Sequence, residues 1–114
     1  MHIKEFSTRV VMFKLAAALE KYEMDLRRLA EAWLDAALFR RLQEEFSELR
    51  ILGASLPRLS VAWVAVLVSR TRLVQALCRG RSSWGAELQE HLKAVEGLRR
   101  HRRRSIGAQN VVLA

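Results

Sequence analysis

The stretch LSVAWVAVLVSRTRLVQAL, residues 59–77, decides the fold of this chain. Eight consecutive residues within it, 61–68, are apolar, and Pro57 and Gly80 bound it on either side. The five valines between residues 61 and 74 would also suit a buried strand. However, the apolar pattern runs far beyond the length of an ordinary strand, about five or six residues. We therefore predict a helix over residues 57–79 that is buried on most sides and needs apolar faces around it.

The first half of the chain is predicted to supply those faces. Residues 8–52 contain neither glycine nor proline and are rich in helix-forming residues. Apolar residues recur there at steps of three and four, first at Leu15, Leu19, Tyr22, Leu26, Leu29 and Trp33, and then at Leu34, Leu38, Leu42, Phe46 and Leu49. A single helix over residues 9–50 would be about 60 Å long. We therefore expect a break, with residues 22–25 as the first choice and residues 35–37 as the second.

The last third of the chain follows a loop, GRSSWG, at residues 80–85. Apolar residues again recur at helical steps, at Trp84, Leu88, Leu92, Val95 and Leu98. One proline and five glycines are too few for most all-β domains. We predict an all-α domain over residues 1–104, a four- or five-helix bundle with a central, mostly buried hydrophobic helix and a basic C-terminal segment. Residues 105–114 are predicted to form a tail.

Charge is distributed unevenly along the chain. Residues 1–52 carry nine basic and nine acidic side chains, whereas residues 53–114 carry eleven basic and three acidic ones. The whole net charge of +8 therefore belongs to the second half. Such asymmetry indicates a polyanionic partner for that half.

Arginines are the candidate contacts with such a partner. Five lie within residues 99–104, and guanidinium groups bind phosphate in a bidentate manner while staying charged. Further arginines precede them at a spacing that places several near one helical face, and a tryptophan among them would stack on a base. The predicted nucleic-acid contacts are Arg58, Arg72, Arg79, Arg81, Trp84, Arg99, Arg100, Arg102, Arg103 and Arg104. A solubilising tail, an anionic membrane surface or an acidic protein would also explain the basic run.

The predicted function is non-enzymatic. We expect a small basic helical subunit that binds the backbone of RNA or DNA without strong sequence specificity, inside a nucleoprotein assembly. In size and charge alone it resembles the small helical subunits of CRISPR effector complexes. The alternative is a protein-interaction module that grips a protein partner, or a second copy of itself, through the seam Leu34, Leu38, Leu42, Phe46 and Leu49.

Other chemistry has little support in the sequence. No nucleotide-binding or hydrolase motif occurs, so no catalytic residue and no cofactor is predicted. His2, His91 and His101 are too dispersed for a metal site, and Cys78 is expected to be a buried thiol. Arg70 and Arg72 would each cost about 2.5–3.5 kcal/mol near a bilayer centre, which argues against a membrane span. The start of the chain does not match a signal peptide, so we expect a cytoplasmic protein.

Overall fold

Four α-helices account for nearly all of the computed structural model: α1 (His2–Leu29), α2 (Ala36–Ala54), α3 (Ser60–Cys78) and α4 (Trp84–Leu113). A short 3-10 helix, η1 (Pro57–Leu59), leads into α3. The structure describes the backbone of residues 2–31, 35–79 and 84–113, and the side chains of residues 8–31, 35–79 and 84–104. These residues contain no strand, so the prediction of an all-helical chain is confirmed.

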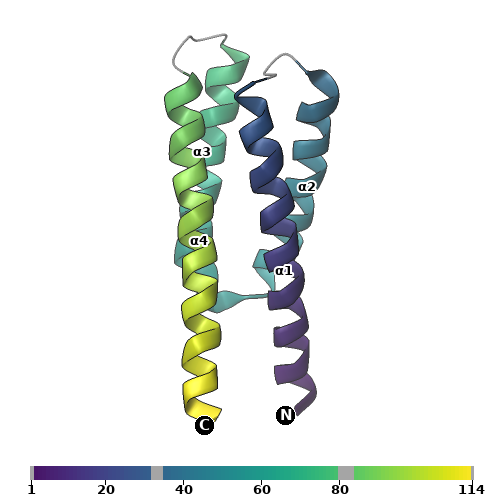
Figure 1. Cartoon of the computed structure of the whole chain (residues 1–114), viewed down its shortest axis with the longest axis vertical. Coiled ribbons are helices and arrows are strands. Elements are labelled where there is room, and N and C mark those ends of the chain that lie inside the picture. The colour runs from purple at the N-terminus through teal and green to yellow at the C-terminus, as the bar shows by residue number, and fades with distance from the viewer. Residues whose placement is uncertain (1, 32–34, 80–83, 114) are drawn as a thin grey trace. The chain divides into compact units, whose positions relative to one another are not determined.

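The chain divides into two compact units, residues 1–57 and residues 58–114. Each unit is a helical hairpin. In unit 1, α1 packs against α2, and in unit 2, α3 packs against α4 (Figure 1). The described residues form four α-helices, and four or five were predicted. That the two hairpins join into one bundle stays a prediction.

The apolar stripes predicted in the first half form the core of unit 1. Tyr22 of α1 and Phe46 of α2 are both buried, with their ring centroids 5.6 Å apart. The same core contains Met12, Leu15, Leu19, Leu26, Leu29, Leu38, Leu42, Leu49 and Leu56. Because a two-helix unit has only one internal interface, these residues must share a single seam between α1 and α2.

The break between α1 and α2 lies near the second predicted position, and the first choice, residues 22–25, is wrong. The buried stripe of α1 continues without interruption to Leu29. Asp35 then caps α2, since its side chain accepts a hydrogen bond from the backbone N–H of Leu38 at 3.1 Å. Trp33, which was expected in the core, lies outside the described residues. At the other end of α2, Gly53 lies inside the last turn and not beyond it.

The helix α3 is confirmed, but burial on most of its sides is not observed. Only one stripe of α3 is buried, the stripe that faces α4, and it includes Val66, Leu73 and Ala76. By contrast, Val61, Val64 and Val68 are 82%, 56% and 45% exposed. The reason is that the hairpin gives α3 a single neighbouring helix. Among the described residues, the stretch Pro57–Cys78 is long and apolar enough to cross a membrane on length and composition alone, a test that core helices also pass.

The helix α4 extends past the predicted end of the folded domain. Its backbone stays helical through Leu113, so residues 105–113 continue the helix where a tail was expected. Arg99 to Arg104 therefore lie within a helix and not at its end. Successive residues then point in different directions around its axis.

Candidate polyanion interface

The arginine run of α4 is distributed around the helix. Arg103 and Arg104 are exposed, whereas Arg99 and Arg102 are half-buried. Arg99 and Arg100 both lie near the carboxylate of Glu96, at 3.3 Å and 3.6 Å. The run therefore includes arginines that are already paired within the helix and arginines that make no ion pair among the described residues.

Arg102 occupies the side of α4 that carries the core residues, one turn beyond Leu98. Its Nε is buried and has no hydrogen-bond partner in the part of the chain that the structure describes. Burial, followed by the charges of Arg103 and Arg99, lowers the pKa of Arg102. Burial and the two neighbouring positive charges thus both disfavour the charged form of Arg102.

Arg58 joins this group through the fold. It lies in η1, and its carbonyl oxygen accepts a hydrogen bond from Nε2 of His101 at 3.0 Å. That bond ties the start of α3 to the middle of the arginine run, although the two residues are 43 positions apart. The sequence spacing suggested that Arg58 shares a face with Arg72 and Arg79; the structure adds a link between the Arg58 backbone and His101, inside the arginine run.

The other predicted contacts lie elsewhere on unit 2. Arg72 is exposed on α3, and Arg79 is exposed directly after the end of that helix. Trp84 begins α4 and is half-buried, so its ring is only partly available for stacking. Arg81 lies outside the described residues. Arg58, Arg72, Arg79, Arg103 and Arg104 make no ion pair among the described residues.

The predicted protein-binding seam is part of the core of unit 1. Leu38, Leu42, Phe46 and Leu49 are at most 6% exposed and pack between α2 and α1. Leu34 lies outside the described residues. The seam shifts along the sequence because α2 is a new helix facing α1, and the four described residues are not exposed on this hairpin for a partner.

Unit 1 neutralises its charges internally. Arg41 of α2 donates two hydrogen bonds to Asp25 of α1, at 3.1 Å and 3.3 Å, and Arg28 lies 3.6 Å from the same carboxylate. Arg27 pairs with Glu23 at 2.9 Å. The four-residue step from Glu23 to Arg27 is visible in the sequence, whereas no local spacing reveals the link between Asp25 and Arg41.

Glu45 completes this network. Glu45 is only 7% exposed, and neither buried carboxyl oxygen accepts a hydrogen bond from another described residue. Burial, and then the neighbouring Asp25, raises the pKa of Glu45 to about 7. Burial opposes ionisation of Asp25 too, but the hydrogen bond from Glu45 and the charge of Arg41 hold its pKa below the ordinary value. Two carboxyl groups form a hydrogen bond only when one holds a proton, and these directions assign the proton to Glu45.

Unit 2 contains a buried polar pair that sequence reasoning also missed. His91 is completely buried, and its Nδ1 lies 2.8 Å from Oγ of Ser69 on α3. The signal was available, because His91 falls at helical spacing from Leu88 and Val95 on the core stripe. Cys78, in contrast, is exposed at the end of α3, so its predicted burial is wrong.

The described residues show no group of three His, Cys, Asp or Glu side chains placed to hold a metal ion. Comparisons with protein families, with curated proteins and with solved structures found no match to this chain.

Proposed function

We propose that unit 2 binds the sugar-phosphate backbone of RNA or DNA without strong sequence specificity, as a non-enzymatic subunit of a nucleoprotein assembly in the cytoplasm. The observation that carries this proposal is the contrast between the two hairpins. Unit 1 is neutral and pairs Arg27, Arg28 and Arg41 with buried carboxylates. Unit 2 carries the entire net charge of +8.

The arginines of unit 2 that form no ion pair among the described residues do not stabilise the hairpin, so phosphate binding explains them better than folding does. Exposed single ion pairs add little to stability, and unpaired like charges subtract from it. Arg58, Arg103 and Arg104 are exposed, and the backbone of Arg58 is hydrogen-bonded to His101, which precedes Arg103 and Arg104 by two and three positions. We infer that a phosphate bound here is contacted by more than one of these guanidinium groups. The contact consists of charge and hydrogen bonds to the backbone and includes no reading of base edges.

Salt dependence tests the proposal directly. Fluorescence anisotropy of short labelled RNA, single-stranded DNA and duplex DNA is measured against the full chain at increasing salt. If about six phosphates are neutralised, affinity for the duplex should fall roughly 10³-fold between about 50 and 200 mM salt. All sequences of one type should bind within a few-fold of each other, because backbone contacts carry no sequence information.

A matched pair of triple variants locates the site. Arg58→Gln, Arg103→Gln and Arg104→Gln together should reduce the slope of log affinity against log salt by about three. The control removes the same charge from unit 1 by replacing Arg9, Arg40 and Arg50, which are exposed and make no ion pair among the described residues. Its slope should match that of the unchanged chain. Absent or salt-insensitive binding, or an equal loss in the control, would refute the proposal.

A further inference from the structure

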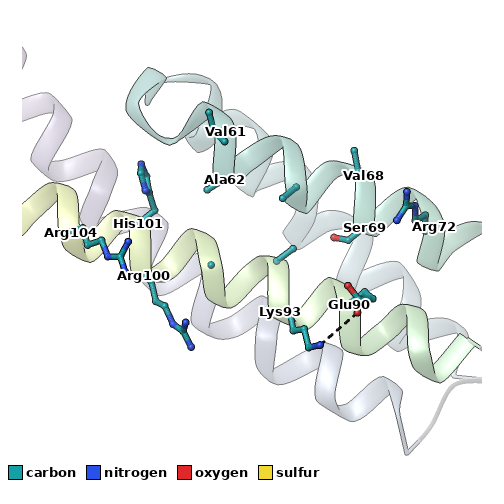
Figure 2. Close-up of a pocket in the computed structure, with 13 residues that line it drawn as sticks. Val61, Ala62, Val68, Ser69, Arg72, Glu90, Lys93, Arg100, His101 and Arg104 are labelled. Atoms are coloured by element: carbon teal, nitrogen blue, oxygen red, sulfur yellow. Dashed lines mark ion pairs between the residues drawn. The ribbon is translucent and has the colours of Figure 1, made fainter.

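A groove of about 670 Å³ runs along one side of unit 2 between α3 and α4. Its middle is lined by small or apolar residues, with Ala65 and Val68 from α3 and Ala94 and Gly97 from α4. Figure 2 shows His101 of α4 extending toward the start of α3 at one end, near Val61. The groove lies beside the core stripe of the hairpin and meets it at Ser69, which is buried and also lines the groove.

The lining residues follow helical spacing on both walls. On α3, Val61, Ala65, Val68 and Arg72 step by four, three and four. Such spacing keeps each set on one stripe, as in helices that pack along a seam with a neighbour. Residues 61–72 span about 16 Å of α3, which is about three turns. The groove therefore has the length and periodicity expected of a binding site for a third helix.

No side chain among the described residues of unit 2 fills this groove. Val61 and Val68 are 82% and 45% exposed. Gly97 lies in the middle of α4, where a glycine weakens a helix by roughly 0.5–1 kcal/mol relative to alanine. A Cβ atom at Gly97 would meet nothing within 4 Å, so the packing of α3 on α4 does not require a glycine there. A floor of alanine and glycine would let the backbone of another helix approach closely.

The ends of the groove are cationic. The two helices run antiparallel, so Arg72 and Lys93 lie toward one end, and Arg100 and Arg104 lie toward the other. Glu90, the only acidic residue among those that line the groove, is paired with Lys93 at 3.7 Å, and Arg100 lies 3.6 Å from Glu96. Arg72 at one end and Arg104 at the other make no ion pair among the described residues. A complementary ligand is therefore apolar in its middle and acidic at both ends.

We propose that this groove binds an amphipathic helix of a partner protein, about three turns long, with apolar residues at helical spacing and Asp or Glu at both ends. A second copy of unit 2 carries +8 and would be repelled. Nucleic acid does not match an apolar floor without aromatic side chains. A flat bilayer surface does not reach a floor of alanine and glycine that lies between two helices.

The test uses the full chain and a synthetic helical peptide with leucines on one stripe and glutamates at both ends. Its twin carries lysines in place of the glutamates. Titration with the labelled acidic peptide should saturate at one peptide per chain, and the lysine twin should bind at least about tenfold more weakly. No saturation of the acidic peptide up to about 1 mM, or equal binding of the twin, overturns the proposal.

Two valines on α3 provide a matched control. Val68→Gln changes a groove residue, whereas Val64→Gln changes an exposed valine outside the groove. Both should keep the helical content of the chain, because neither side chain is buried. Only Val68→Gln should weaken the acidic peptide, by about tenfold, the effect of losing one well-buried apolar contact. Equal effects of both variants would mean that the peptide does not occupy the groove.

Three further assays test whether nucleic acid, a membrane or a second copy of the chain binds the groove instead of a partner helix. Val68→Gln should leave nucleic-acid binding unchanged, and the triple variant Arg58→Gln, Arg103→Gln and Arg104→Gln should weaken nucleic acid more than peptide. Vesicles that contain phosphatidylserine should not bind in a manner that depends on Val68. Light scattering should show no self-association that Val68→Gln abolishes. A Val68-dependent loss in any of these three assays would assign the groove to nucleic acid, to a membrane or to a second copy, and would overturn the proposal.

Discussion

The stability of unit 2 should depend on pH through His91. Nδ1 of this buried side chain lies 2.8 Å from Oγ of Ser69, and that hydroxyl donates to the carbonyl oxygen of Val66 at 3.0 Å. A hydroxyl has one proton, so Ser69 uses it on Val66 and accepts from His91. Nδ1 therefore carries the proton of the neutral ring, and a second proton would add a charge inside the hairpin.

The size of the effect follows from the shifted equilibrium. Burial, and secondarily the charge of Arg70, lowers the pKa of His91 from 6.5 to about 4. Between these values the unfolded chain binds more protons than the folded chain, so stability rises with pH. The stabilisation is complete above pH 6.5 and is lost as the pH falls toward 4. The two pKa values correspond to about 3 kcal/mol, a substantial part of the 5–15 kcal/mol that typically stabilises a small protein.

Hydrogen exchange followed by mass spectrometry measures this in each hairpin separately. After correction for the intrinsic exchange rate, protection of the α4 core should fall roughly 10²-fold between pH 7 and pH 4. His91→Leu should remove that dependence, because leucine fills a similar volume and does not titrate. Ser69→Ala should lower protection at every pH by about 1–3 kcal/mol, since it leaves a buried donor unpaired, and should keep the pH dependence. Equal protection of α4 at pH 7 and pH 4, or the same fall in His91→Leu, would refute the assignment.

Three other substitutions test single features of the fold. Unit 1 should show the opposite pH response, because the pKa of Glu45 is raised to about 7 and the folded unit therefore binds an extra proton between about pH 4.5 and 7. Its stability should fall by at most about 3 kcal/mol as the pH rises through that range, which hydrogen exchange of α2 would detect. Glu45→Gln should abolish this response. Gly97→Ala should raise the free energy of unfolding by roughly 0.5–1 kcal/mol in urea titrations, and a loss would mean that the residue is packed more tightly than observed. Asp35→Ala should lower it by about 0.5–2 kcal/mol through loss of the bond from Leu38 N–H, whereas Asp35→Asn should retain most of it.

Local periodicity explains what the sequence predicted well. The stripe of α1 that ends at Leu29 repeats every three or four positions, so it can be recognised in the sequence. The cap at Asp35 was not predicted, and residues 35–37 were only the second choice for the break. The apolar run of α3 predicted a helix, but an apolar composition does not say which of its faces this chain covers. Val61 is 82% exposed for that reason.

Contacts between helices were beyond sequence reasoning. Arg41 reaches Asp25 across 16 positions, His91 reaches Ser69 across 22, and His101 reaches the carbonyl of Arg58 across 43. None of these pairs has a characteristic spacing, because their geometry depends on how each hairpin closes. The link from Arg58 to His101 therefore could not be predicted, and the role of Arg58 as a polyanion contact stays a prediction.

The two hairpins should respond differently to a bound polyanion. In unit 1, Asp25 already faces Arg41 and Arg28, whereas in unit 2 burial, followed by the charges of Arg103 and Arg99, lowers the pKa of Arg102. If a polyanion binds folded unit 2 and not the unfolded chain, it would add about 2.7 kcal/mol of stability at a hundred times its Kd. Protection from hydrogen exchange should therefore rise roughly 10²-fold in α4 and stay constant in α2 when saturating RNA is added at low salt. Equal gains in protection in both hairpins would show that the binding surface extends beyond unit 2. If protection of α4 does not rise, the polyanion does not bind unit 2.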